Sequence, residues 1–130
     1  MYKQKTFAQT VREKYGDSLE EFAFRMCVSR STVKKWEDGK KPGALHMALL
    51  LYANEHELAM KPEAPEWFRK LDAAGKMKCI CGMLRYTIGE IAIRLKVEPT
   101  TAFRWKRDNK MARPAERLVC EYFVHPDKFE

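Results

Sequence analysis

The 130-residue sequence lacks the long apolar segment that a membrane-spanning helix requires. No run of apolar residues approaches the roughly 20 that would cross a bilayer. The opening stretch, MYKQKTFAQTVREKYG, also contains no apolar core of a secretory signal. We therefore expect a cytoplasmic protein with no membrane partner.

Cysteine and histidine are scarce, and their spacing does not suit a metal site. The four cysteines (Cys27, Cys79, Cys81 and Cys120) include a single CxC pair, whereas zinc sites commonly use CxxC or HxxxH pairs. The three histidines are dispersed along the chain. We interpret the cysteines as small buried apolar residues in a reducing compartment, and we predict no metal and no cofactor.

Glycine is limited to six residues, and none of them belongs to a glycine-rich loop that cradles phosphate. The sequence also contains no motif that pairs a nucleophile with a general base. We therefore predict that the protein is not an enzyme.

Basic residues outnumber acidic ones by 25 to 18, which gives a formal net charge of +7. The excess lies at the two ends of the chain. Residues 1–53 carry ten Lys or Arg against six Asp or Glu, residues 85–130 carry ten against seven, and residues 54–84 carry five of each. This distribution favours a polyanionic partner, nucleic acid above all, bound by two units that a neutral spacer joins.

Two segments that lie 69 positions apart (105 − 36 = 69) match each other without a gap. SLEEFAFRM at 18–26 aligns with TIGEIAIRL at 87–95, and the match continues to Trp36 and Trp105. Each segment opens with a capping box, Ser/Thr-x-x-Glu, followed by apolar residues at helical spacing. We interpret the match as an internal repeat in which a short helix, a short turn and a second helix follow one another.

The second helix of each copy has an apolar side and a polar, basic side. Val33 and Trp36 in the first copy, and Ala102 and Trp105 in the second, fall on the side that should face the core. Two short helices with one apolar seam and an exposed basic face have the layout of a helix-turn-helix.

The string VSRSTVKKWEDGKKP, at 28–42, resembles the helix-turn-helix of the Xre/Cro family, which includes phage repressors and related antitoxins. The family pattern is approximately T-Q-x-x-L-A, a loop ending V-S, then S-T-V-x-x-W-E-x-G-x-x-x-P. The resemblance covers about Thr6 to Leu58, with Leu19 in place of the family's Gln and Cys27 in place of its loop glycine. The second copy, TIGEIAIRLKVEPTTAFRWKRDNKMARPAERL, resembles more divergent Cro-like variants over about Lys76 to Tyr122.

The start of the second helix differs between the copies. Ser29 is a predicted N-cap in the first copy, whereas Glu98 takes that position in the second and Pro99 takes the first helical position. Phe103 stands where polar residues are common in the family.

The resemblance implies that the second helix of each copy enters the major groove of DNA. Arg30 and Lys35 carry donors that suit guanine, and Phe103 can contact a thymine methyl or mark a protein-binding surface. The predicted DNA-binding residues are Arg30, Ser31, Lys34, Lys35, Lys40 and Lys41 in the first copy, and Thr100, Phe103, Arg104, Lys106, Arg107 and Lys110 in the second.

The segment between the copies is predicted to be a linker. Its first part, 61–65, is proline-rich and extended, and the following EWFRKLDAAG favours a short amphipathic helix that ends at Gly75. Trp67, Phe68 and Leu71 lie on one side of that helix, where they can pack two domains or two chains together. The predicted organisation is a domain at 1–60, a linker at 61–75 and a domain at 76–130.

The sequence thus predicts an all-α protein with two small helix-turn-helix domains in tandem. We expect a sequence-specific regulator that binds double-stranded DNA and represses transcription, of phage or mobile-element origin. Because one small domain contacts little DNA, two readers are expected, from one chain or from a homodimer. The alternative is a protein-interaction module, an antitoxin or an inhibitor of a host complex, which an exposed patch of Phe103, Trp67 and Phe68 would support.

Overall fold

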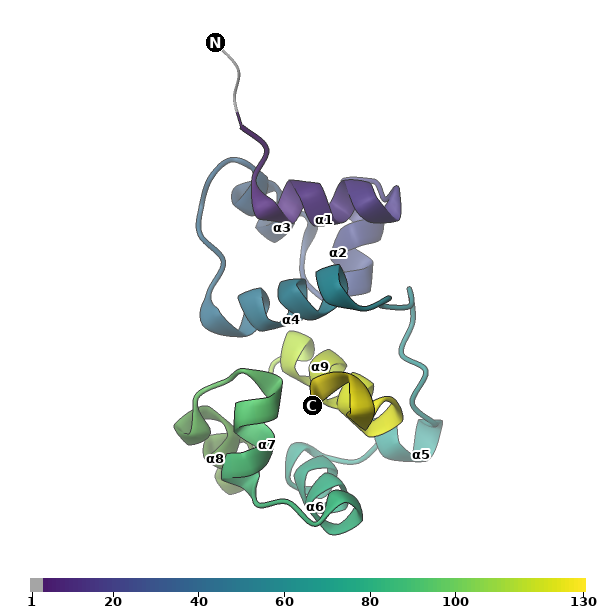
Figure 1. Ribbon diagram of the computed structural model, residues 1–130, viewed down its shortest axis with the longest axis vertical. Coiled ribbons are helices and arrows are strands. Elements are labelled where there is room, and N and C mark those ends of the chain that lie inside the picture. Colours follow the sequence, from purple (N-terminus) through teal and green to yellow (C-terminus); the bar gives the residue numbers. More distant parts are fainter. Residues whose placement is uncertain (1–3) are drawn as a thin grey trace. The chain divides into compact units, whose positions relative to one another are not determined.

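The computed structural model describes residues 4–130, and all the regular structure within them is helical (Figure 1). The predicted all-α class is confirmed. In the described part of the chain, no helix has the length and apolar character needed to cross a membrane. The elements are α1 (Phe7–Tyr15), α2 (Leu19–Met26), α3 (Arg30–Glu37), α4 (Ala44–Glu55), α5 (Glu66–Arg69), α6 (Ala73–Leu84), α7 (Ile88–Leu95), α8 (Pro99–Arg107), α9 (Arg113–Val124) and the 3₁₀ helix η1 (Pro126–Phe129).

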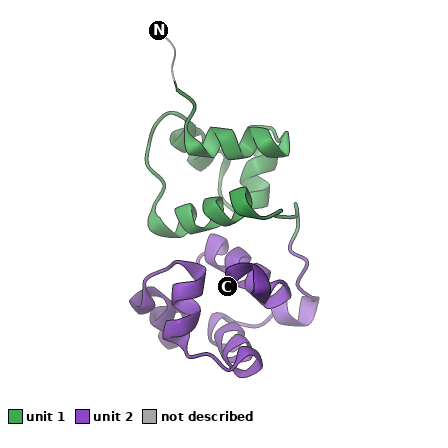
Figure 2. Cartoon of the chain, viewed as in Figure 1, with its two compact units in different colours: residues 1–61 green, residues 62–130 purple. Residues whose placement is uncertain are grey.

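The chain divides into two compact units, which Figure 2 shows in green and purple. Unit 1 comprises residues 1–61 and contains α1 to α4. Unit 2 comprises residues 62–130 and contains α5 to α9 and η1. Within unit 1, α1 packs against α2, α3 and α4; within unit 2, α6 packs against α7, α8 and α9.

The two ends of α2 follow from local hydrogen bonds. The Ser18 side chain accepts from the Glu21 N–H, and the Glu21 carboxylate accepts from the Ser18 N–H at 3.0 Å, as the capping box predicts. The bond from the Ser18 N–H is the main cause of a lowered pKa for Glu21. At the other end Cys27 adopts the left-handed conformation, with φ of 57°, which lets the Val28 N–H reach the Ala23 carbonyl at 3.0 Å.

Helix α3 is capped at its start and anchored on its inner side. The Ser29 hydroxyl accepts from the Thr32 N–H at 3.2 Å, so the predicted N-cap is confirmed. Val33 is fully buried and Trp36 is 4% exposed, as the sequence pattern predicts. The Trp36 ring lies 5.3 Å from the ring of His46 on α4, and burial there lowers the pKa of His46.

The start of unit 2 differs from the prediction. The predicted helix ending at Gly75 is wrong: α5 ends at Arg69, and Gly75 lies in the first turn of α6. The Gly75 N–H donates to the Asp72 carboxylate at 2.8 Å, and this N-cap bond offsets the weak helix propensity of glycine. The buried Lys76 ammonium donates to the carbonyls of Arg69 and Leu71, which satisfies the end of α5.

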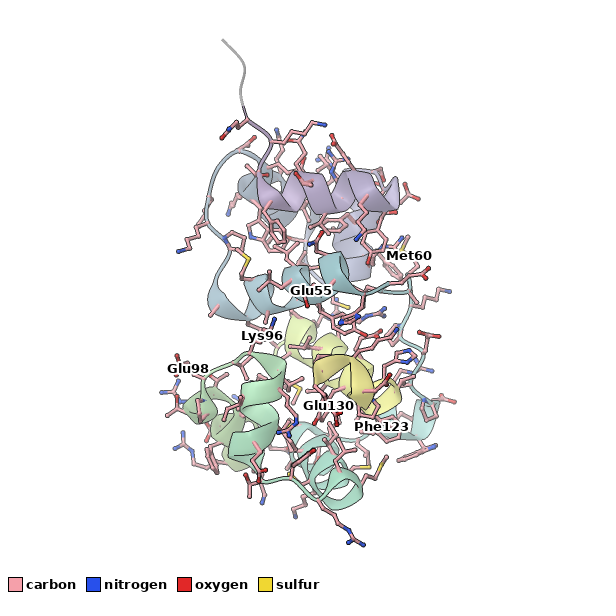
Figure 3. All side chains as sticks on the ribbon, in the orientation of Figure 1. Glu55, Met60, Lys96, Glu98, Phe123 and Glu130 are labelled. Carbon is pink, nitrogen blue, oxygen red and sulfur yellow. The ribbon has the colours of Figure 1, made fainter. Side chains whose placement is uncertain are left out.

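Helix α7 is capped like α2, whereas the start of α8 differs from that of α3. Thr87 and Glu90 form a second capping box, and Lys96 ends α7 in the left-handed conformation with φ of 61°. Lys96 and Glu98 flank the turn into α8 (Figure 3). Pro99 occupies the first helical position, as predicted, but the Glu98 side chain makes no capping hydrogen bond. Helix α8 therefore lacks the side-chain cap that α3 has.

Replacing Glu98 with Ser is expected to stabilise unit 2 by about 1 kcal/mol, because a hydroxyl there can accept from the Thr101 N–H. Ser29→Ala in unit 1 is the matched control and should cost a similar amount. Thermal unfolding should show shifts of opposite sign, each of about 4–8 °C. An unchanged midpoint for Glu98→Ser would show that the missing side-chain cap does not limit the stability of α8.

Candidate nucleic-acid interface

The outer face of α3 is basic and open to solvent. All six predicted residues of unit 1 are exposed, on α3 or in the loop that follows it: Arg30, Ser31, Lys34, Lys35, Lys40 and Lys41. They lie away from the buried side of the helix, which carries Val33 and Trp36. The arrangement separates the anchoring side chains from those available to a ligand.

The cations of this face differ in their intramolecular partners. Lys34 Nζ lies 3.0 Å from the Asp38 carboxylate, and Arg30 Nε lies 3.9 Å from the Glu20 carboxylate, both on the exposed surface. Exposed ion pairs contribute about 0–1 kcal/mol, so a phosphate or a base edge can displace them. Lys35 forms no ion pair with any residue of 4–130. Its three N–H donors are therefore the most available on the helix.

A bidentate ion pair fixes α3 against α1. Arg12 Nε lies 2.7 Å from one oxygen of the Glu37 carboxylate, and Arg12 Nη2 lies 2.9 Å from the other. Arg12 Nη1 also donates to the Asp17 carbonyl at 2.9 Å. The bonds to Glu37 raise the pKa of Arg12. Because Glu37 is the last residue of α3, the pair ties the end of this helix to α1.

A second buried pair ties α2 to the rest of unit 1. Arg25 Nε and Nη2 donate to the Asp17 carboxylate at 2.8 and 3.0 Å, and Nη1 donates to the Leu58 carbonyl at 2.6 Å. The guanidinium lies 4.3 Å above the ring of Tyr15. This network joins the loop before α2 to the segment after α4.

The outer face of α8 combines cations with one aromatic ring. All six predicted residues of unit 2 are exposed: Thr100, Phe103, Arg104, Lys106, Arg107 and Lys110. Arg107 Nε lies 2.9 Å from the neighbouring Asp108 carboxylate. Phe103 is 53% exposed, whereas Ala102 and Trp105 on the inner side are buried, as predicted. The α8 face is therefore cationic like that of α3, but it has a different set of side chains.

Phe103, Trp67 and Phe68, whose joint exposure would support a protein-interaction module, do not form one exposed patch, because Phe68 is fully buried. Its ring stacks on Phe123 of α9 with centroids 4.1 Å apart. Trp67 is 58% exposed and meets Phe123 edge to face at 5.5 Å. Phe68 is thus a core residue of unit 2.

One group of side chains could reach a metal ion. Glu63, Glu121 and His125 carry ligand atoms that all lie within 4.8 Å of one another. The sequence spacing gave no sign of this group, because Glu63 precedes α9 by several elements. Arg117 lies 3.4 Å from Glu121, and His125 Nε2 lies 3.4 Å from the Glu63 carboxylate, so these pairwise contacts account for the group.

Comparison with known proteins relates part of unit 1 to a family. A helix-turn-helix family model matches residues 9–51, from within α1 to within α4. No curated protein and no solved structure matches the chain. The matched segment contains α2, α3 and the whole α3 face, and the match supports the predicted likeness of unit 1 to the Xre/Cro family. Residues 9–51 therefore form a helix-turn-helix of the kind found in DNA-binding regulators.

Proposed function

We propose that the chain is a transcriptional repressor of phage or mobile-element origin, which binds duplex DNA through α3 at its own promoter and blocks polymerase. The observation that carries this proposal is the exposed basic face of α3 within a segment that matches the helix-turn-helix family. An α-helix has the width of the major groove, and Lys35 and Arg30 have the donors that bind guanine O6 and N7. The proposal includes no catalytic step.

The loop after α3 supplies contacts of a different kind. Lys40 and Lys41 are exposed just beyond the end of the helix, where they can neutralise backbone phosphates. Phosphate contacts set affinity and its salt dependence but carry no sequence information. We therefore assign base reading to α3 and non-specific affinity to the loop.

Unit 2 is proposed to be a second reader. The support is the capping box and the left-handed end that α7 shares with α2, together with the exposed cations of α8. One small domain gives limited contact with DNA, so a second reader increases both affinity and selectivity. If one chain supplies both readers the site is asymmetric, whereas a homodimer requires an inverted repeat with half-sites about 34–36 Å apart.

Lys35→Ala is expected to weaken binding to the protein's own upstream DNA by about 1–3 kcal/mol, roughly 5- to 150-fold, and to relax the preference at one base pair. Lys40→Ala is the matched control, because losing a phosphate contact should weaken all sequences alike and lower the salt slope by about one. Fluorescence anisotropy on upstream and scrambled duplexes at several salt concentrations measures both effects.

The proposed function fails if the unaltered protein does not bind its upstream DNA at low salt, or binds every duplex equally. An equal loss for Lys35→Ala on both duplexes would make Lys35 a phosphate contact. The second candidate is a module that binds a protein partner such as a toxin or a host complex, for which exposed Phe103 and Trp67 are available although Phe68 is buried. Capture of a specific partner together with absent DNA binding would support that candidate.

A further inference from the structure

The α8 face carries a large apolar side chain where α3 carries a cation. Phe103 corresponds to Lys34 in the 69-residue alignment (103 − 34 = 69), and its ring is 53% exposed. In unit 1 the Lys34 ammonium is paired with Asp38 at 3.0 Å. Where unit 1 has a cation paired with a carboxylate, unit 2 therefore has an apolar ring exposed to water.

The surroundings of Phe103 are polar and cationic. Thr100 lies one turn before it, Arg104 lies next to it and Arg107 lies one turn after it, and all three are exposed. Arg104 and Lys106 form no ion pair with any residue of 4–130. A partner that covers the ring must also offer negative charge and acceptors to these neighbours.

We propose that Phe103 reads the 5-methyl group of a pyrimidine in the major groove, next to a guanine read by Arg104. The thymine methyl is the apolar group that the major groove presents, and Arg binds guanine O6 and N7 with two hydrogen bonds. Phosphates flanking the groove supply the negative charge that the remaining cations require. This inference rests on the proposed function of unit 2 as a second DNA reader.

Helix geometry allows the ring and the guanidinium to act on one base step. Consecutive residues of an α-helix differ by about 100° in direction and about 1.5 Å in height. Phe103 and Arg104 are both exposed on α8 and point in directions about 100° apart, so they can reach different bases of one site. The predicted target contains a thymine next to a guanine, and 5-methylcytosine in place of thymine offers the same methyl group.

The test compares thymine with uracil, which lacks only the 5-methyl group. The probe is a labelled duplex selected from a randomised library by the full-length protein, with each thymine replaced in turn by uracil. Loss of one buried methyl contact should weaken wild-type binding about fourfold at one or two positions. Phe103→Ala should show no further loss at those positions. Ile93→Ala, which removes another exposed apolar side chain of unit 2, is the matched control and should keep the uracil effect.

The outcomes separate this inference from the proposed function. If Arg104→Ala weakens binding but no uracil substitution does, the methyl reading is wrong and unit 2 remains a reader. If Arg104→Ala and Phe103→Ala both leave the affinity and the footprint unchanged, the α8 face does not contact DNA. The methyl reading by Phe103 and the proposed role of unit 2 as a second reader then both fail. Full DNA affinity of Phe103→Ala, as expected if the ring binds a protein, overturns the proposal. The uracil series on the unaltered protein needs no variant, so misfolding cannot mask its result.

Discussion

Replacing Trp36 with Ala is expected to unfold most of unit 1 and to abolish sequence-specific DNA binding. Trp36 is 4% exposed and packs against His46 of α4, so its removal empties the space between α3 and α4. Truncating a buried Trp typically costs about 3–5 kcal/mol. A domain of this size is stable by only roughly 5 kcal/mol, so little stability would remain. Circular dichroism during denaturation and DNA binding by anisotropy measure the two losses.

The other tryptophans supply an internal control. Trp67 and Trp105 both belong to unit 2, so the fluorescence of Trp36→Ala follows unit 2 alone while circular dichroism follows both units. We expect the fluorescence midpoint of Trp36→Ala to equal that of a Trp36→Phe reference, because both report the unfolding of unit 2. The circular dichroism transition of Trp36→Ala should begin at a lower temperature or denaturant concentration than its fluorescence transition. Trp105→Ala combined with Trp67→Phe leaves Trp36 as the one fluorescent tryptophan, in unit 1, and should show the reverse pattern. A fluorescence midpoint that moves with the dichroism would contradict a loss confined to unit 1.

The sequence predicts the helix-turn-helix well because its signals are local. The capping boxes at Ser18 and Thr87, the Ser29 N-cap and the start of α8 at Pro99 each depend on residues within one turn. The inward position of Trp36 follows from helical periodicity alone. These features need no knowledge of the rest of the fold.

The prediction of a helix ending at Gly75 is wrong because two local signals compete there. Gly75 favours the end of a helix, but Asp72 three residues earlier is a stronger signal for a start, and the structure follows Asp72. Helix α1 was not predicted, although Thr6 caps it and Gly16 ends it with φ of 67°. The first helix of each unit lies outside the repeat that drew attention to the motif.

The helix that precedes each turn, α2 or α7, ends in a left-handed residue that is not glycine. The family's loop glycine is Cys27 here, and the structure keeps the left-handed backbone, with φ of 57°, without a glycine. Lys96 does the same in unit 2 with φ of 61°. Each non-glycine residue in this conformation costs about 1 kcal/mol or more, which the rest of the turn must offset. The sequence shows that Cys27 replaces the glycine, but the structure is needed to show that the backbone conformation is kept and that only its free-energy cost changes.

The sequence does not predict which charged side chains pair when they lie far apart in the chain. Arg12 and Glu37 are separated by 25 positions, and nothing in the local pattern of either residue indicates the other. Arg25 was aligned with Arg94, yet Arg25 pairs with Asp17 whereas Arg94 stacks on Tyr86 at 3.7 Å. Identical residues in the two copies thus have different partners, because only the fold decides which groups meet.

Breaking the Arg12–Glu37 pair is expected to destabilise unit 1 and to weaken DNA binding. The two side chains are 19% and 10% exposed, so either charge left alone is poorly solvated. Removing one partner of a buried pair costs about 3–5 kcal/mol, and we expect about 2–3 kcal/mol here because some solvent reaches both groups. Arg12→Lys should recover only part of the loss, because an ammonium cannot bind both carboxylate oxygens in the same geometry.

A double-mutant cycle separates stability from positioning. Glu37→Leu and Arg12→Met should each be destabilising alone, while the double variant should regain most of the stability because no unpaired charge remains. Specific DNA affinity should stay reduced in the stable double variant, because α3 is no longer held against α1 by two directed bonds. The control is the ion pair of Lys5 and Glu13, whose side chains are 60% and 41% exposed. The expected coupling free energy of this pair is at most about 1 kcal/mol. If the Arg12–Glu37 coupling is as small, or the double variant binds DNA normally, the pair does not position the α3 face.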